Sequence, residues 1–266
     1  MFCNPRARTG GWAWEDVLPA LSAIIITRNE AKNIAACLES VAFCDERIVV
    51  DAGSSDETVA IAESCGAAVT THAWAGFGPQ KNVALSLARG DWVLSIDADE
   101  RVSPPLAAEI KAAIAAPVAD GYEMPRLSTF LGRTMRHSGW FPDYVLRLFR
   151  RENARFTDAL VHERVVCRGR IGRLTIPLDH HPVLRLEDAV ARADSYSTAG
   201  AKMLAASDRR VTFMSGIGHG LWSFLRAYVL RRGFLDGPEG FLLAVANAEG
   251  TYYRYMKAWL ARRRLG

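Results

Sequence analysis

The sequence is poor in cysteine and has no long hydrophobic run. Its five cysteines are widely spaced, odd in number and form no Cys-x-x-Cys pair. This pattern argues against a zinc site or a disulfide framework and indicates reduced residues of a cytoplasmic protein. The apolar run at 17–27 is interrupted by Pro19 and is much shorter than the roughly 20 residues that cross a bilayer. Residues 1–15 contain no apolar stretch of signal-peptide length, so we expect neither export nor a spanning helix.

Charge is unevenly distributed along the chain. The formal net charge is +4, yet the segment from Arg209 to Gly266 holds ten Lys and Arg against three Asp and Glu, so the first 208 residues carry a small acidic excess. Half of the 266 residues are hydrophobic, which allows a sizeable core and argues against disorder. No recognised nucleic-acid-binding fold accompanies the basic segment, so nucleic acid is not an expected partner.

An apolar run that ends in two carboxylates occurs at Leu94-Ser95-Ile96-Asp97-Ala98-Asp99-Glu100. Residues 92–96 are typical of a buried strand, so Asp97 and Asp99 are expected at the carboxyl edge of a sheet, where open α/β sheets bind ligands. In extended geometry residues i and i+2 point to the same side, so both carboxylates can face one ligand. A hard divalent cation shared with substrate phosphates would neutralise them. Asp-x-Asp alone is equally consistent with an acidic turn before the helix that starts at Pro104-Pro105.

Strand and helix patterns alternate over about the first hundred residues. Buried strands are predicted at 21–27, 47–50, 67–71 and 92–96, with helices between them from about 34, 57 and 76. This alternation predicts a doubly wound, Rossmann-like α/β sheet.

The period changes beyond Pro117. Short strands are predicted at 121–126, 144–149, 161–167 and 171–176, and helices at 186–206, 220–235 and 240–264. We expect mixed strands that carry a second substrate, followed by a helical appendage. The chain is accordingly divided into 17–120, 121–182 and 183–266.

The last two predicted helices mix aromatic and basic side chains, such as Trp222 with Arg226 and Tyr255 with Lys257. Helices of this kind suit an anionic membrane surface, where each well-placed basic residue contributes roughly 1 kcal/mol. The alternative is an appendage that packs on the sheet and leaves a solvated basic face.

Four motifs follow one another in the first half: ITRNE after the first strand, VVDAGSSDET after the second, GPQKN at a helix start and LSIDADE after the fourth strand. Together they resemble the nucleotide-sugar-binding half of a GT-A glycosyltransferase of family 2. The later GWFPDYVLRLFRR, VHE and GFLDGPEG stretches are similar to the lipopolysaccharide-core glucosyltransferases of that family. The resemblance covers about residues 21–260. It implies a GT-A fold and favours the metal-site interpretation of Asp97 and Asp99.

The resemblance implies roles for four residues toward the nucleotide. Thr27 and Asn29 would contact the uridine, and Asp51 would accept a hydrogen bond from the uracil ring. Lys81 would reach the diphosphate or the uracil. Without the motif order, Thr27 and Asn29 could simply cap the first helix, Asp51 could be a turn former, and Lys81 could be a solvated charge on a helix.

The carboxylates divide between donor and acceptor. By the resemblance, Asp97 would contact the ribose or the sugar and help to hold the metal, and Asp99 would ligate Mg²⁺ or Mn²⁺. The base that deprotonates the acceptor hydroxyl would be Glu163 of Val161-His162-Glu163 or, as the second candidate, Asp143. Glu163 could also be a strand residue paired with Arg164, and Asp143 a turn former after Pro142.

The pair His180-His181 is tempting as a metal site. Adjacent residues on a strand point to opposite faces, so both cannot easily bind one ion, and we assign neither of them to catalysis.

These features predict a metal-dependent, inverting glycosyltransferase that moves a hexose, glucose by resemblance, from a UDP-sugar to a lipid-linked inner-core sugar of lipopolysaccharide. It would work as a peripheral protein at the cytoplasmic face of the inner membrane. Alternatives are an enzyme of the same fold that acts on polyprenyl phosphate or a peptide, and a nucleotide-binding or membrane-binding module without turnover. A nucleotidyltransferase is disfavoured because no glycine-rich loop with basic residues is present.

Overall fold

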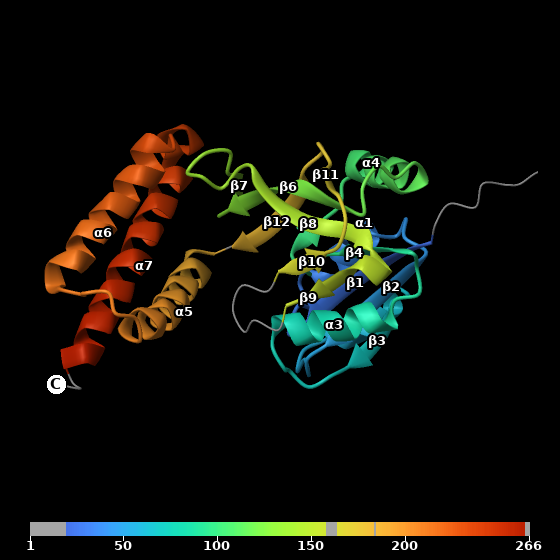
Figure 1. Ribbon diagram of the computed structural model, residues 1–266, viewed down its shortest axis with the longest axis horizontal. Helices are drawn as coiled ribbons and strands as arrows, with labels where there is room; N and C mark the ends of the chain where they lie inside the picture. Colours follow the sequence, from blue (N-terminus) through green and yellow to red (C-terminus); the bar gives the residue numbers. More distant parts are fainter. Residues whose placement is uncertain (1–19, 158–163, 184, 264–266) are drawn as a thin grey trace, which may run out of the picture.

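The computed structural model describes residues 20–157, 164–183 and 185–263. An α/β body and a bundle of C-terminal helices lie side by side, and strand β12 leads from the first into the second (Figure 1).

A ten-stranded mixed sheet forms the body. Its strands follow the order β3-β2-β1-β4-β8-β6-β12-β5, and β7 and β11 pair with β6. The strands are β1 (Leu21–Thr27), β2 (Glu46–Asp51), β3 (Ala68–Thr71), β4 (Trp92–Ser95), β5 (Glu100–Arg101), β6 (Gly121–Phe130), β7 (Arg133–Thr134), β8 (Asp143–Arg150), β11 (Ile171–Arg173) and β12 (Leu178–Val183). A separate ribbon joins β9 (Ala154–Phe156) and β10 (Val165–Cys167).

The sheet changes direction at β8. Strands β1 to β4 pair in parallel, whereas β8 is antiparallel to β4 and β6 and β12 is parallel to β6. The predicted doubly wound first half and mixed second half of a GT-A fold are therefore confirmed, and their strands belong to one continuous sheet.

Helices cover both faces of the first half. They are α1 (Ile34–Ser40), α2 (Thr58–Ser64), α3 (Phe77–Leu87) and α4 (Pro104–Ala115). Alternate residues of β1 enter different cores, because Ile25 packs with α1, α2 and α4, and Ile24 packs with α3. A strand buried on both faces needs the continuous β-branched run that the sequence shows. Ser103 caps α4, as its hydroxyl accepts a hydrogen bond from the Leu106 N–H at 3.4 Å.

The C-terminal bundle consists of α5 (Leu186–Ala205), α6 (Phe213–Leu225), a π turn (Arg226–Leu230), a 3₁₀ turn (Gly233–Asp236) and α7 (Gly237–Arg263). The predicted start of the middle helix at Gly220 is wrong, because α6 already begins at Phe213. Its early glycines are required by packing: a Cβ on Gly216 would lie 2.3 Å from Met256 Cε, and one on Gly220 would lie 3.2 Å from Tyr252 Cβ. Within the described residues, none of the helices combines the length and apolar character that a bilayer-spanning segment needs.

Candidate active site

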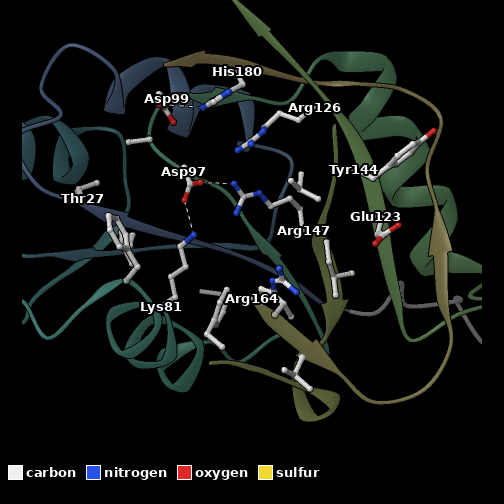
Figure 2. A pocket seen from close by; sticks show the side chains of 18 of the residues that line it. Thr27, Lys81, Asp97, Asp99, Glu123, Arg126, Tyr144, Arg147, Arg164 and His180 are labelled. Carbon is white, nitrogen blue, oxygen red and sulfur yellow. Dashed lines mark hydrogen bonds and ion pairs between the residues drawn. The ribbon is translucent and has the colours of Figure 1, made fainter. Parts of the chain in front are cut away.

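A cavity of about 1450 Å³ opens where β1 and β4 end. Thr27 comes from the end of β1, Lys81 from α3, and Asp97 and Asp99 from the turn after β4. Arg147 on β8 and residues of the β9–β10 ribbon close the other side (Figure 2). The cavity therefore lies at the carboxyl edge of the parallel strands, where the sequence predicts a ligand site.

The cavity is rich in positive charge. Among the described residues that line it, six are Lys or Arg and four are Asp or Glu. The excess of cations suits a ligand with more than one negative charge, such as a diphosphate.

Asp97 is held between two cations. One of its carboxylate oxygens lies 2.9 Å from Lys81 Nζ, and the other accepts a hydrogen bond from the guanidinium of Arg147 (Figure 2). Burial alone would raise the pKa of Asp97, but the charges of Arg147 and Lys81 outweigh it and hold the pKa well below its usual range. Asp97 is thus an anion whose oxygens are both engaged by the protein itself.

Arg147 connects Asp97 to a second buried carboxylate. Its guanidinium lies 2.6 Å from an oxygen of Glu100, which is fully buried, and the other Glu100 oxygen accepts the backbone N–H of Asp97 at 3.0 Å. Arg126 lies 3.6 Å from Glu100 and 2.6 Å from Asp143. This charge network fixes the turn that presents Asp97 and Asp99.

Asp99 faces a histidine rather than a cation pair. Its carboxylate lies 3.5 Å from His180 Nε2, and His180 Nδ1 lies 2.8 Å from Ser128 Oγ. Burial opposes ionisation of Asp99, but the hydrogen bond and charge of His180 lower its pKa. His181 contacts Thr129 instead, with 3.1 Å between Nδ1 and Oγ1. The two histidines thus have different partners, and only His180 lines the cavity.

The donor set fits a cation that it shares with a substrate. The described residues contain no group of three or more His, Cys, Asp or Glu that could hold a metal ion. Asp99 and His180 nevertheless supply an oxygen and an imidazole nitrogen on the same side of the cavity. Mg²⁺ is commonly held by one or two carboxylates, and water and substrate phosphates supply its other ligands. Asp99, with His180 beside it, would therefore suit a cation that takes its other ligands from substrate and water, and not a closed protein site.

The first two loops hold each other in place. Asn29 adopts a left-handed conformation with φ of 57° and accepts the Ser55 N–H at 2.8 Å through its side chain. Asp51 is buried, and its carboxylate accepts hydrogen bonds from Thr27, Gly53 and Ser54. Of the predicted uridine contacts, Thr27 lines the cavity, whereas Asn29 and Asp51 stand behind it as loop-forming residues. A bond from Asp51 to uracil would have to replace one of its present bonds.

The two predicted base candidates fall in different places. Asp143 starts β8 and lines a second cavity of about 600 Å³ beside the first, where it accepts hydrogen bonds from Arg126. Glu163 lies outside the described residues. Arg126 and His180 line both cavities, so the two are adjacent.

Arg147, Glu100 and His180 complete the site and were not assigned by the sequence analysis. Arg147 and His180 reach Asp97 and Asp99 from β8 and β12, many residues further along the chain. The arginine-rich stretch LRLFRR could have pointed to Arg147 as a site residue. The histidines were noticed, but only as a possible two-histidine metal site, which was rejected.

Several known proteins are similar to this chain. The profile of Glycosyl transferase family 2 matches residues 22–169. An uncharacterized glycosyltransferase of Rickettsia felis is 34% identical over 250 residues, which is 89% of this chain and 88% of that protein. The lipopolysaccharide core biosynthesis glycosyltransferase LpsC of Rhizobium meliloti is 31% identical over 253 residues, which is 90% of either chain. Among solved structures, TarS 1-349 of S. aureus in complex with UDP-GlcNAc has a TM-score of 0.46 and 17% identity, with 92% of each chain covered.

Proposed function

Because this chain belongs to glycosyl transferase family 2, we propose that it transfers a hexose, glucose in the simplest case, from a UDP-sugar to an inner-core sugar of lipopolysaccharide. The observation that carries this proposal is the cation-rich cavity at the ends of β1 and β4, into which Asp97 and Asp99 project. The likeness to LpsC over nearly the whole of both chains supports the acceptor class.

The donor would lie across the carboxyl edge of the parallel strands. Thr27 would contact the uridine, Lys81 and Arg147 would face the diphosphate, and Asp97 would contact the ribose or the sugar. Arg147 Nε is buried and has no hydrogen-bond partner within the described residues, so a phosphate oxygen would satisfy it. Asn29 and Asp51 would support the uridine through the loops that they hold together.

A divalent cation would be held by Asp99 and His180. When bound, it neutralises charge that grows on the leaving diphosphate and so stabilises the transition state more than the ground state. Lys81 and Arg147 act on the same charge from the protein side. Asp97, whose own charge they already balance, keeps both cations in position.

The transfer would be a single displacement with inversion. The acceptor oxygen forms the new bond to the anomeric carbon while the bond to UDP breaks, and the hydroxyl proton passes to a carboxylate. Glu163 remains our first candidate for that base. Asp143 is the second candidate, and its place in the cavity beside the donor site supports it.

The division of the chain follows from this proposal. Residues 17–120 would hold the donor, 121–182 the acceptor, and 183–266 the membrane surface on which the acceptor is anchored. A row of exposed apolar side chains supports the last assignment, as it follows one face of α6 and continues into the turns after it. Its members on α6 are Phe213, Met214, Ile217, Leu221, Trp222 and Leu225, with exposures of 40% to 65%.

The test is UDP release from a panel of UDP-sugars with purified core lipid as acceptor, in Mn²⁺, Mg²⁺ or a chelator. We expect release to need metal and to fall on the order of 100-fold in Asp99→Asn. Binding of Mn²⁺ in the presence of UDP, followed by electron paramagnetic resonance, should weaken in both Asp99→Asn and His180→Ala. If UDP release changes neither with the chelator nor in Asp99→Asn, the proposed donor site is refuted.

The same assay separates the rivals. Glu163→Gln and Asp143→Asn identify the base, because only loss of the true base abolishes transfer while UDP binding persists. Release driven by polyprenyl phosphate or a peptide, but not by core lipid, would change the acceptor class. UDP binding without turnover on any acceptor would indicate a non-catalytic module.

A further inference from the structure

A second cavity lies between the sheet and the C-terminal bundle, beside the proposed donor cavity. Its volume is about 600 Å³. Its walls come from β6 and β12 of the sheet, from the loop that carries Trp140, and from the facing sides of α5 and α7. This is the junction between the α/β body and the helices in Figure 1.

The cavity carries positive charge that its own carboxylate does not balance. Among the described residues that line it, three are arginines and one, Asp143, is acidic. Asp143 is already paired with Arg126 at 2.6 Å. Neither Arg192 nor Arg254 lies within ion-pair distance of a carboxylate in the described part of the chain. An anionic group is the ligand that two such guanidinium groups would bind.

The remaining lining suits a sugar ring. Trp140 is half-buried and is held edge-on against Phe130, with ring centroids 5.9 Å apart. Tyr196 is 65% exposed on the facing side of α5. Asn247 adds a side-chain amide that forms no hydrogen bond within the described residues. Aromatic faces pack on the apolar face of a sugar, and amides bind its hydroxyls.

The two cavities meet at a small set of shared side chains. Arg126, His180, Arg192 and Tyr196 line both of them. A saccharide in the second cavity would therefore reach the place where Asp99 and His180 would hold the divalent cation of the donor.

We infer that the second cavity binds the acceptor saccharide and selects one that carries a negatively charged group, with Arg254 and Arg192 on the anion and Trp140 on the ring. The inference rests on the proposed transferase function and adds the class of acceptor to it. The anion can be a sugar phosphate or a sugar carboxylate, since both present oxygens that arginine binds bidentately.

Arg254 offers the cleanest test because it lines the second cavity and not the first. Arg263 is its matched control on the same helix. Both guanidinium groups stack on an aromatic ring of α7, Arg254 over Tyr255 at 5.4 Å and Arg263 over Trp259 at 4.8 Å, but Arg263 lines neither cavity.

The experiment is calorimetric titration of the full-length protein with deacylated inner-core oligosaccharide and, separately, with UDP and Mn²⁺. We expect Arg254→Gln to weaken oligosaccharide binding at least tenfold and to leave the Kd for UDP within twofold, whereas Arg263→Gln changes neither. Unchanged UDP binding also shows that the variant is folded. Phosphatase treatment or carboxyl reduction of the oligosaccharide identifies the source of the anion, because the treatment that removes it should reproduce the loss.

Equal binding by Arg254→Gln and the wild type would overturn the inference. The inference would also be overturned if an oligosaccharide without phosphates and carboxylates bound as tightly as the untreated oligosaccharide. If UDP-sugar binds and is turned over but the oligosaccharide does not bind, this acceptor site is refuted while the transferase stands. If the oligosaccharide binds and UDP-sugar does not, the cavity assignment survives and the proposed transferase fails.

Discussion

Arg147 balances the charge of two carboxylates beside the donor cavity. It contacts Asp97 and Glu100, and its own side chain is only 9% exposed. A buried ion pair costs several kcal/mol to break from one side, because the remaining charge stays unpaired. Arg147→Met should therefore lower the free energy of unfolding by about 3 kcal/mol, since Lys81 and Arg126 still reach the two carboxylates.

The matched control is Arg173→Met, which removes an arginine that is 64% exposed and paired with Glu123 at 3.1 Å. A surface pair of this kind contributes less than about 1 kcal/mol. Urea unfolding followed by circular dichroism measures both. Equal losses in the two variants would show that the network around Arg147 is no stronger than a solvated pair.

We expect Asp97 to make the free energy of unfolding depend on pH in the acidic range. Its pKa in the folded protein lies below the value of about 3.9 in the unfolded chain. Its contribution is therefore present above pH about 4 and is lost as the pH falls toward the folded pKa. The difference in unfolding free energy between the wild type and Asp97→Asn should shrink from pH 6 to pH 3. A difference that stays constant between pH 6 and pH 3 would contradict this role of Asp97.

The sequence alone could assign residues to one site only where they lie close together in the chain. Asp97 and Asp99 stand out because they follow a buried strand directly. Their partners Arg147 and His180 come from β8 and β12, which join the sheet only through long-range pairing. The rule that adjacent strand residues face opposite ways correctly separates His180 from His181, but it does not say which of them meets Asp99.

At the scale of elements, Asp236 joins the C-terminal bundle to the loop between β7 and β8. It ends the 3₁₀ turn before α7, is buried, and accepts the backbone N–H groups of Arg136 and His137 at 3.1 and 2.9 Å. Asp236→Ala leaves these donors unpaired and should cost about 1–3 kcal/mol of stability. UDP binding should persist, because Asp236 lies outside the donor cavity.

Thermal unfolding and UDP titration test this role. Asp208→Ala, which removes an exposed aspartate of the same helical region, should leave both measurements unchanged. A stable Asp236→Ala variant would mean that the apolar contacts of Phe130, Ala189 and Leu243 suffice to dock the bundle.

Element boundaries were predictable where one physical signal dominated. The β-branched run gave β1 its correct ends, and Pro104 after Ser103 marked the start of α4. The start of α6 was hidden by glycines that disfavour an isolated helix but allow close approach to α7. The histidine pair was treated as part of a strand, but the bounds of β12 (Leu178–Val183) and its place between β6 and β5 were not predictable, because pairing partners distant in sequence set them.

At the scale of the whole molecule, three surfaces would have separate roles. The first cavity would bind the donor, the second cavity would bind the acceptor, and the exposed apolar row of α6 would bind the membrane. Arg226, Arg231 and Arg232 are exposed next to that row. Apolar side chains that enter the interface together with flanking cations are the arrangement by which helices bind anionic bilayers. The membrane would then act by concentrating the enzyme on its lipid-linked acceptor and would leave the chemistry unchanged.

If the α6 row binds the membrane and the two cavities bind the substrates, a change in the row should affect transfer to core lipid but not transfer to the deacylated oligosaccharide. Trp222 is 54% exposed on the α6 row, and placing a charge there forfeits its burial in the bilayer, roughly 1.5–3 kcal/mol. Trp222→Asp should therefore raise the KM for core lipid in anionic vesicles about tenfold or more and leave kcat/KM for the deacylated oligosaccharide within twofold. Val118→Asp, a change at a residue that is 70% exposed between α4 and β6, should alter neither value. A matching loss on both acceptors would point to damage within the bundle, and an unchanged KM on vesicles would show that this face does not bind the membrane.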